Sequence, residues 1–376
     1  MKRIVIMGCT GSIGQSALKV VSHLSDSFQI LGLGCHSNVT LLREQILRYS
    51  PRFVAVHEES AAKQLADLDV EVFVGEEGMS RLAALEESDF VLMAILGLAA
   101  LKPTLSAITS GKGVGLANKE VLVSAGELVM AAVQKHNTML IPIDSEHSAI
   151  FQCLHKLEKK SVRRIILTAS GGPFANFTPA ELEKVTLEQA LIHPTWRMGA
   201  KITIDCSTLM NKGFEVIETR WLFDVPEEKI DVVVHPQSVI HSIVEGIDGV
   251  LFAQLHAPSM TVPIQYALTF PDRMPGLAKP FDFLEYSRMD FTPPDRKKFP
   301  CLDLAFEALK VGSSFSCYLN AANEVLVQRF LDRQISWKDI TVKLEALMQR
   351  HKAEELSSFD AVFTVDGEAR EEAYKE

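Results

Sequence analysis

The sequence lacks the features that mark exported, membrane-bound or disulfide-stapled proteins. Its six cysteines include no CxxC pair and no repeated short spacing, which argues against both a zinc knuckle and a disulfide framework and favours a reducing cytoplasm. The apolar run at residues 90–101 has 12 residues, against the roughly 20 that a spanning helix needs. The apolar residues 4–7 are too few for a signal peptide. We therefore expect a cytoplasmic protein with no membrane partner.

Cationic residues are also in short supply. Lys and Arg number 38 against 48 Asp and Glu, a formal net charge of −10, so we expect no nucleic-acid partner, although a local basic pocket stays possible. Hydrophobic residues make up 47% and charged residues 23%, which is typical of a globular protein. At roughly 150 residues per domain, 376 residues indicate two or three domains with at least one sizeable core.

The first part of the chain alternates between strand and helix patterns. An apolar run at residues 3–7 is followed at once by Gly8, Gly11 and Gly14 and then by a helical pattern. This alternation predicts a doubly wound parallel sheet, Rossmann-like in class. Further strands are expected at 29–33, 53–56, 70–74, 90–93, 113–116 and 139–143, and helices at 41–48 and 119–135.

The pattern changes after about residue 145. Short, punctuated strands indicate an α+β region with its own sheet, and residues 302–350 have a helical pattern. Between them, the proline-rich residues 270–300 are predicted to form a surface linker. The strands of this region are expected at 162–168, 201–205, 232–234, 238–245 and 250–255.

The first glycine turn predicts a nucleotide site. Glycines between a strand and a helix let backbone N–H groups approach a pyrophosphate, although the spacing here is GxxGxxG and a plain tight turn is the alternative. The acid that usually holds the ribose 2′-OH of NAD is absent after the second strand. His36, Ser37 and Asn38 stand there instead and favour NADP, unless they only cap the helix that begins near Thr40.

Three carboxylates suggest a site for a hard metal ion. Asp144 and Glu146 follow the strand at 139–143, at the edge where parallel sheets place ligands, and Glu215 begins an amphipathic helix. If the three meet, their oxygens select Mg²⁺ or Mn²⁺, which would act as a Lewis acid. The alternative is that all three are acids in the first turns of helices, with Asp144 or Ser145 as an N-cap.

Groups suited to a phosphate lie between these acids. They are the turn that starts at Ser170 and the segment 207–212, which ends in Asn211 and Lys212. The segment 193–199 contains Trp196 and a glycine, and it forms either a lid or an anchor buried at a domain junction.

Seven motifs, in order along the chain, resemble 1-deoxy-D-xylulose 5-phosphate reductoisomerases. The most specific is HPTWRMGAKITIDCSTLMNKGFEVIE at 193–218. The others are GCTGSIG at 8–14, GLANKE at 115–120, IPIDSEHSAIFQCL at 141–154, TASGGPF at 168–174, HPQSVIHSIVEG at 235–246 and LNAANEV at 319–325.

The resemblance implies an enzyme that converts 1-deoxy-D-xylulose 5-phosphate into 2-C-methyl-D-erythritol 4-phosphate with NADPH and Mg²⁺ or Mn²⁺, in the non-mevalonate isoprenoid pathway. It also implies a homodimer. The expected divisions are an NADPH-binding domain at 1–146, a catalytic and dimerisation domain at 147–285, a linker at 286–300 and a C-terminal helical domain at 301–376.

The resemblance also implies roles for individual residues. The metal ligands would be Asp144, Glu146 and Glu215, and the catalytic residues Lys119, Glu146 and His193. Substrate contacts would be Lys119, Ser145, Glu146, Ser170, His193, Trp196, Cys206, Asn211, Lys212 and Glu215. Cofactor contacts would be Thr10, Gly11, Ser12, Ile13, His36, Ser37, Asn38, Asn118, Glu120 and Gly199.

The chain departs from the family pattern at a few positions. Cys206 stands where the family usually has a hydroxyl that contacts phosphate, and a thiol is the poorer donor. Ser37 stands where the family often has a basic residue near the 2′-phosphate. His256, Ser259 and Thr261 replace the usual Gly, Asp and Arg, a change without an evident reason in the sequence.

Two other classes of protein remain as alternatives. One is a different NADP-dependent oxidoreductase, such as a semialdehyde or homoserine dehydrogenase, which would share the glycine loop but would not need three convergent carboxylates. The other is a non-catalytic nucleotide sensor, against which Lys119 and the acids argue.

Overall fold

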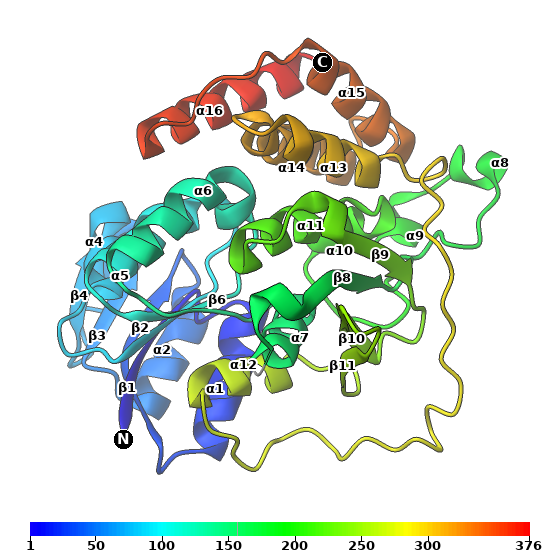
Figure 1. Ribbon diagram of the computed structural model, residues 1–376. Helices are drawn as coiled ribbons and strands as arrows, with labels where there is room; N and C mark the ends of the chain where they lie inside the picture. Colours follow the sequence, from blue (N-terminus) through cyan, green and yellow to red (C-terminus); the bar gives the residue numbers. More distant parts are fainter. Residues whose placement is uncertain (156) are drawn as a thin grey trace. The chain divides into compact units, whose positions relative to one another are not determined.

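The computed structural model describes residues 1–155 and 157–376 and divides into two compact units (Figure 1). The first unit comprises Met1–Val121, Val129–Ser148 and Ser259–Lys279. The second comprises Leu122–Leu128, Ala149–Pro258 and Pro280–Glu376. The chain therefore returns to its first unit late in the sequence, in a segment that the sequence pattern assigned to the catalytic part. The division into three domains stays a prediction.

The first unit contains a seven-stranded sheet in which every pairing is parallel. Its order is β4-β3-β2-β1-β5-β6-β7, so the chain moves outward from β1 in one direction and then resumes on the other side of it. The resulting switch point between β1 and β5 is where doubly wound folds bind ligands. The strands are β1 Lys2–Met7, β2 Phe28–Cys35, β3 Phe53–Val56, β4 Glu71–Val74, β5 Phe90–Met93, β6 Gly113–Leu116 and β7 Leu140–Pro142.

Helices connect these strands and cover the sheet. In the first helix the buried residues Ala17, Leu18, Val20 and Val21 recur at helical spacing. A short helical turn precedes the fifth helix, and a late helix packs against the first one. The helices are α1 Ser12–His23, α2 Val39–Tyr49, α3 Glu59–Lys63, α4 Gly75–Ala83, η1 Leu98–Ala100, α5 Leu101–Thr109, α6 Glu120–Lys135, α7 Ser145–Leu154 and α12 Thr261–Thr269, with parts of α6 and α7 in the second unit.

The second unit is built on a four-stranded mixed sheet of order β11-β10-β8-β9. Strand β10 is antiparallel to both of its neighbours, whereas β8 and β9 are parallel. The strands are β8 Val162–Ala169, β9 Ile230–Val234, β10 Ile240–Gly246 and β11 Leu251–Leu255. The helices of this part are η2 Lys159–Ser161, α8 Pro179–Leu182, α9 Leu187–Ala190, α10 Ala200–Ser207, α11 Met210–Phe223 and η3 Glu227–Lys229.

The C-terminal helices complete the second unit, as the predicted helical pattern indicated (orange to red in Figure 1). Helix α14 is the most enclosed of them, because its neighbours α13, α15, α16 and α10 all pack against it. The bounds are α13 Cys301–Val311, α14 Phe315–Leu331, α15 Trp337–Arg350 and α16 Phe359–Lys375.

One predicted strand is wrong. Residues 201–205 belong to helix α10, where Thr203, Ile204 and Asp205 are buried. Because residues 202–204 are Ile, Thr and Ile, the local composition favours a strand, but Gly199 at the N-cap and an ion pair from Lys201 to Asp205 at 2.9 Å favour the helix. Glu215 also lies in the second turn of α11 rather than at its start.

Candidate active site

The glycine loop lies at the switch point of the parallel sheet. Gly8 follows β1 with φ +82°, and a Cβ there would lie 2.3 Å from the Ala94 carbonyl oxygen after β5. Gly14, in the first turn of α1, allows an equally close approach, because its Cβ would lie 2.3 Å from the Gly8 carbonyl oxygen. Gly11 is the N-cap of α1. The loop is therefore compact, and the predicted contacts Thr10–Ile13 occupy the N-terminus of α1, which favours an anion.

The three polar residues after β2 lie at the predicted place, and one of them also has a structural role. Asn38 is the N-cap of α2, with its Oδ1 accepting from the Leu41 N–H at 3.3 Å, so the capping interpretation is confirmed for this residue. His36 and Ser37 are exposed. The His36 ring stacks on His57, and its Nδ1 lies 3.3 Å from Ser37 Oγ and 3.7 Å from Glu58 Oε1. The proposed contact of His36 and Ser37 with a 2′-phosphate stays a prediction.

Asn118 shapes the loop beside the glycine turn. Its Nδ2 donates to the carbonyl oxygens of Ile95 at 2.7 Å and Gly97 at 2.9 Å, and its Oδ1 accepts from the Val121 N–H at 2.8 Å. The side chain therefore fixes the loop that follows β5 against the start of α6, where Glu120 is the first residue. Its predicted contact with the cofactor stays a prediction.

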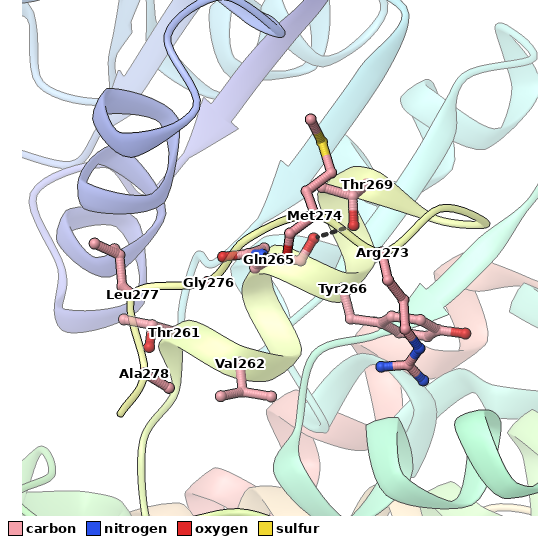
Figure 2. A pocket seen from close by; sticks show the side chains of 10 residues that line it. All are labelled: Thr261, Val262, Gln265, Tyr266, Thr269, Arg273, Met274, Gly276, Leu277 and Ala278. Atoms are coloured by element: carbon pink, nitrogen blue, oxygen red, sulfur yellow. Dashed lines mark hydrogen bonds between the residues drawn. The ribbon is translucent and has the colours of Figure 1, made fainter. Parts of the chain in front are cut away.

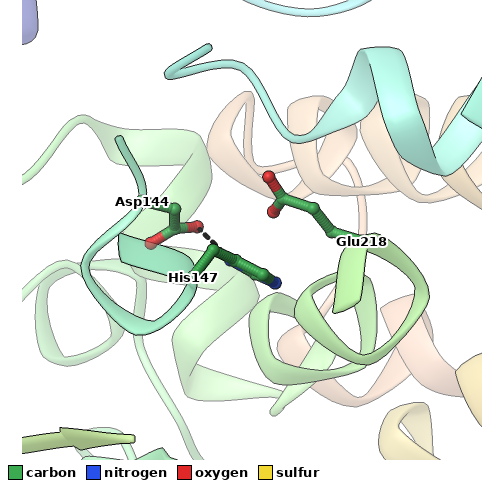
Figure 3. A group of neighbouring side chains, drawn as sticks. All are labelled: Asp144, His147 and Glu218. Atoms are coloured by element: carbon green, nitrogen blue, oxygen red, sulfur yellow. Dashed lines mark ion pairs between the residues drawn. The ribbon is translucent and has the colours of Figure 1, made fainter. Parts of the chain in front are cut away.

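Acidic and basic side chains meet at the C-terminal ends of β6 and β7. Lys119 Nζ lies 2.7 Å from Asp144 Oδ2, and both side chains are largely buried. Ser145 begins α7, and its hydroxyl donates to Glu146 Oε2 at 2.6 Å. The fully buried ring of His147 places Nδ1 3.9 Å from Asp144 Oδ2, as Figure 3 shows. Asp144 thus lies between the Lys119 ammonium and the His147 ring.

Ser170 and His193 form a polar pair in the second unit. His193 Nδ1 accepts from the backbone N–H groups of Trp196 at 3.0 Å and Thr195 at 3.2 Å, so the ring proton of the neutral form lies on Nε2. Nε2 then donates to Ser170 Oγ at 3.0 Å, which also accepts from the Gly172 N–H at 3.2 Å. Burial lowers the pKa of His193 to about 4. Ser170 Oγ therefore accepts two hydrogen bonds, and its own hydroxyl proton is still available to donate.

The segment between α10 and α11 approaches the glycine turn after β8. Gly172 has φ +70°, and a Cβ on it would lie 2.5 Å from the Cys206 carbonyl oxygen. Cys206 is half-buried, and no disulfide involves it among the described residues. Leu209, which connects the two helices, takes the left-handed conformation at φ +61°. The two segments predicted to bind a phosphate, one with Ser170 and one with Cys206, therefore meet at the backbone contact between Gly172 and Cys206.

The first turns of α11 bring three of the predicted residues together. Asn211 Nδ2 donates to Glu215 Oε1 at 2.6 Å, and Lys212 Nζ forms an ion pair with Oε2 of the same carboxylate. Lys212 and Glu215 are both buried. The cation and the amide both compensate the buried carboxylate, whose charge would otherwise be costly to bury.

The structure reveals a histidine pair that sequence reasoning missed. His241 on β10 stacks on His256 with ring centroids 3.8 Å apart, and His241 Nε2 donates to the His256 carbonyl oxygen at 3.1 Å. The Trp196 ring meets the His241 ring edge to face, with centroids 6.2 Å apart. Burial lowers the pKa of His241 to about 3. His256, one of the departures from the family pattern, thus stacks on the histidine that contacts Trp196, and no local sequence signal indicates this contact.

A cavity of about 200 Å³ lies in the first unit and is lined by residues between Thr261 and Ala278 (Figure 2). It is lined by α12 and the segment that follows it, including Thr261 and Tyr266, with Arg273 over the Tyr266 ring. Thr261 is one of the departures from the family pattern, and none of the predicted site residues lines this cavity.

The predicted residues are divided between the two units. Those in the first unit are Thr10, Gly11, Ser12, Ile13, His36, Ser37, Asn38, Asn118, Lys119, Glu120, Asp144, Ser145 and Glu146. Those in the second are Ser170, His193, Trp196, Gly199, Cys206, Asn211, Lys212 and Glu215. The structure brings neighbours together within each set, as the pairs above show.

These features define a class of protein. A glycine loop at the switch point of a doubly wound sheet, together with buried carboxylates each paired with a lysine, is typical of a nucleotide-dependent oxidoreductase that acts on an anionic substrate.

Comparisons with known proteins give the family. The chain matches the models of 1-deoxy-D-xylulose 5-phosphate reductoisomerase at residues 4–126, of its C-terminal domain at 140–223, and of the DXP reductoisomerase C-terminal domain at 255–372. The chain belongs to the 1-deoxy-D-xylulose 5-phosphate reductoisomerase family, and the resemblance seen in the sequence is confirmed.

Relatives match over the whole chain. The reductoisomerase of Protochlamydia amoebophila is 53% identical over 99% of this chain and 98% of its own length. That of Thermoanaerobacter pseudethanolicus is 48% identical over 100% and 99%. A crystal structure of the Zymomonas mobilis enzyme in complex with NADPH is 42% identical, with a TM-score of 0.93 over 100% of this chain and 98% of that one. A structure of DOX-P reductoisomerase with NADPH, fosmidomycin and magnesium is 35% identical, also with a TM-score of 0.93, and covers 100% and 98%.

Proposed function

We propose that this chain converts 1-deoxy-D-xylulose 5-phosphate into 2-C-methyl-D-erythritol 4-phosphate, with NADPH as reductant and a divalent metal ion, in the non-mevalonate isoprenoid pathway. The main support for this proposal is the match to reductoisomerases over the full chain. The match includes the segments that contain Asp144 and Glu215, the two predicted metal ligands that pair with a lysine. A semialdehyde or homoserine dehydrogenase is not favoured, because relatives of this identity and coverage are reductoisomerases. NADPH oxidation on addition of this substrate with Mn²⁺, with a branched polyol phosphate as product, tests the proposal.

NADPH is assigned to the first unit. The pyrophosphate would lie at residues Thr10–Ile13, where the N-terminus of α1 and the compact glycine turn favour a bound anion. His36, Ser37 and Asn38 would face the 2′-phosphate. Asn118 and Glu120 would shape the nicotinamide side, and Gly199 at the N-cap of α10 would close over it. The cofactor supplies a hydride to the aldehyde carbon of the rearranged substrate.

The donor set fits Mg²⁺ or Mn²⁺. We propose Asp144, Glu146 and Glu215 as ligands, since all three offer carboxylate oxygens and hard divalent cations prefer oxygen. Two of the three carboxylates also pair with a lysine, Asp144 with Lys119 and Glu215 with Lys212, so cationic side chains lie beside the proposed ligands. A bound metal ion supplies Lewis-acid polarisation of the substrate ketone and the neighbouring hydroxyl. Mn²⁺ titration followed by electron paramagnetic resonance tests the ligands without an activity assay, with weaker binding expected for Asp144→Asn.

The remaining residues are assigned to the substrate. We propose that Ser170 and Cys206, with Asn211 and Lys212 at the start of α11, surround the phosphate, because hydroxyl, thiol, amide and ammonium donors converge on that stretch of backbone. His193, held neutral by burial, orients Ser170 through its Nε2–H. Trp196 would cover the substrate and exclude water.

Proton handling is assigned to groups of the first unit. Lys119 would donate to a reacting oxygen of the substrate after exchanging its contact with Asp144. Glu146 would accept a proton, and Ser145, which already donates to it, would orient its carboxylate. These assignments predict that Lys119→Met retains NADPH binding but loses turnover, which a comparison of nucleotide titration with steady-state rates would test.

A homodimer is proposed from the edge of the four-stranded sheet. Strand β11 is the last strand, and within the described part of the chain its only strand partner is β10. Leu251 is 56% exposed and Phe252 40%, and Ile247 and Val250 beside them are also exposed. An apolar, unpaired edge is normally covered, and a second copy of the chain covers it with matching hydrogen bonds. Phe252→Lys would then shift the mass measured by light scattering from dimer to monomer.

A cytoplasmic location is proposed as well. Six free cysteines are consistent with a reducing compartment, and within residues 1–155 and 157–376 no helix has the length and apolar character required to cross a bilayer.

A further inference from the structure

Two buried hydrogen bonds tie the C-terminal helices to the end of α10. Asn323 on α14 donates from Nδ2 to Asp205 Oδ1 at 2.8 Å, and Trp337 on α15 donates from Nε1 to Ser207 Oγ at 2.8 Å. All four residues are buried, with Asp205 1% exposed and Ser207 fully covered. The two contacts lie on either side of Cys206, so both reach the same stretch of backbone from distant parts of the chain.

That stretch is one whose conformation needs support. Leu209 adopts a left-handed conformation at φ +61°, which a branched residue reaches only at a cost in free energy. Strain of this kind persists when the surrounding structure holds it in place. The bonds within the segment are local: Ser207 Oγ donates to the Ile204 carbonyl oxygen at 2.6 Å and Thr208 Oγ1 to that of Asp205 at 3.2 Å. Asn323 and Trp337 add two long-range hydrogen bonds to these local ones.

Asp205 also connects this restraint to the other end of α10. Its Oδ2 pairs with Lys201 Nζ at 2.9 Å, and Lys201 lies two residues after Gly199, the N-cap of α10. The carboxylate is thus shared between a lysine at the start of α10 and the amide of Asn323 on α14. Removal of the Asn323 amide would leave the buried Asp205 Oδ1 without this hydrogen bond. Because an unsatisfied buried acceptor is costly, we expect the C-terminal end of α10 to shift.

We propose that Asn323 and Trp337 are positioning residues for the substrate phosphate, which set residues 206–212 through the hydrogen bonds to Asp205 and Ser207. The inference rests on the proposed function, because it takes Cys206, Asn211 and Lys212 as the phosphate-binding groups. The C-terminal helices then act in substrate binding without contacting the substrate. The motif at 319–325, to which the sequence assigned no role, gains one through Asn323.

The same helices provide matched controls. Tyr318, on α14, donates its hydroxyl proton to Glu372 on α16, a bond within the C-terminal helices that does not reach α10. Asn320, one turn before Asn323, donates instead to Ser124 Oγ at 3.2 Å. Tyr318→Phe is the control for Trp337→Phe, because each variant removes one donor from an aromatic side chain. Asn320→Ala is the control for Asn323→Ala, because each variant removes one side-chain amide from α14.

The experiment measures steady-state kinetics and phosphate affinity on the full chain. For Trp337→Phe and Asn323→Ala we expect KM for 1-deoxy-D-xylulose 5-phosphate, and the inhibition constant of inorganic phosphate, to rise about fivefold to tenfold, the size of one lost hydrogen bond. We expect kcat within about twofold, since neither residue touches reacting atoms. NADPH affinity should stay unchanged. Asn323→Gln keeps the donor and should restore part of the loss.

The outcomes separate this inference from the proposed function. If the wild-type chain turns over the substrate and Tyr318→Phe or Asn320→Ala raises KM as much as its partner variant, the effect is general loosening and the inference fails. An unchanged KM in both Trp337→Phe and Asn323→Ala also overturns it. If the wild-type chain does not oxidise NADPH with this substrate, the proposed function fails instead. Where Asn323→Ala does not fold, Trp337→Phe decides, because it keeps the aromatic packing.

Discussion

The glycine loop of the first unit and residues 206–212 of the second are both assigned to anionic groups, but they are built differently. The loop is local: Gly8 and Gly14 allow backbone atoms of β1, α1 and the β5 end to approach closely, and its donors are backbone N–H groups. The second site uses side chains. Two of its buried hydrogen bonds come from Asn323 and Trp337, which are more than a hundred positions away in the sequence. The first site should therefore tolerate no added Cβ at Gly8 or Gly14, whereas the second should respond gradually to single substitutions.

The largest effect is expected at the loop. In Gly14→Val, the new Cβ would lie 2.3 Å from the Gly8 carbonyl oxygen and 2.5 Å from Cys9 Cα, so the turn cannot keep its shape. We expect NADPH affinity to fall more than about 100-fold, since the loss of a preformed anion site removes several hydrogen bonds at once. Titration of nucleotide fluorescence measures it.

Gly367→Ala is the control for this change. Gly367 lies within α16 and has no atom near the position of an added Cβ, so NADPH affinity should stay at the wild-type value. Wild-type affinity in Gly14→Val would show that the loop is not the cofactor site.

The next largest effect concerns the proposed metal ligands. In Glu215→Gln, Asn211 and Lys212 keep their positions but the carboxylate loses its charge, so we expect kcat to fall roughly 100-fold and the dependence on Mn²⁺ to weaken. Glu228→Gln, at an exposed position of the same unit, should leave the rate unchanged. Normal turnover of Glu215→Gln after the metal is stripped would contradict the assignment.

A smaller effect is expected at Cys206. A hydroxyl donates a stronger hydrogen bond than a thiol, so Cys206→Ser should lower KM for the substrate about threefold with little change in kcat. Parallel kinetics of Cys153→Ser, another half-buried cysteine, provide the control. An unchanged or raised KM in Cys206→Ser would place the residue away from the phosphate.

The smallest effect is a pH dependence of stability. Burial lowers the pKa of His193 from 6.5 to about 4, so between these values the unfolded chain binds more protons than the folded one, and the free energy of unfolding falls as pH is lowered. Urea unfolding of wild type and His193→Gln at pH 7 and pH 5 measures the slope, with a smaller loss expected in the variant. His136→Gln, at an exposed position, should keep the wild-type slope. A His193→Gln slope equal to that of wild type would contradict a buried, neutral imidazole.

Sequence reasoning succeeded where the structure is set by local patterns. The parallel sheet, the glycine turn and the C-terminal helices follow from apolar periodicity and from glycine placement, and the structure confirms them. The strand predicted at 201–205 failed because the β-branched residues were given more weight than a buried helical face, which packs against α11 and α14. The contact between His241 and His256 could not be predicted either, since His241 lies on β10 and His256 directly follows β11, and the pairing of these strands depends on the whole sheet.

The most direct test of the account is the reaction itself, measured on the full-length chain with NADPH, Mn²⁺ and 1-deoxy-D-xylulose 5-phosphate. The account predicts oxidation of NADPH in equal amount to 2-C-methyl-D-erythritol 4-phosphate identified by carbon NMR, dependence on the metal, and loss of the rate in Glu215→Gln. NADPH oxidation that proceeds without the metal, or that yields an unbranched alcohol phosphate, would contradict it.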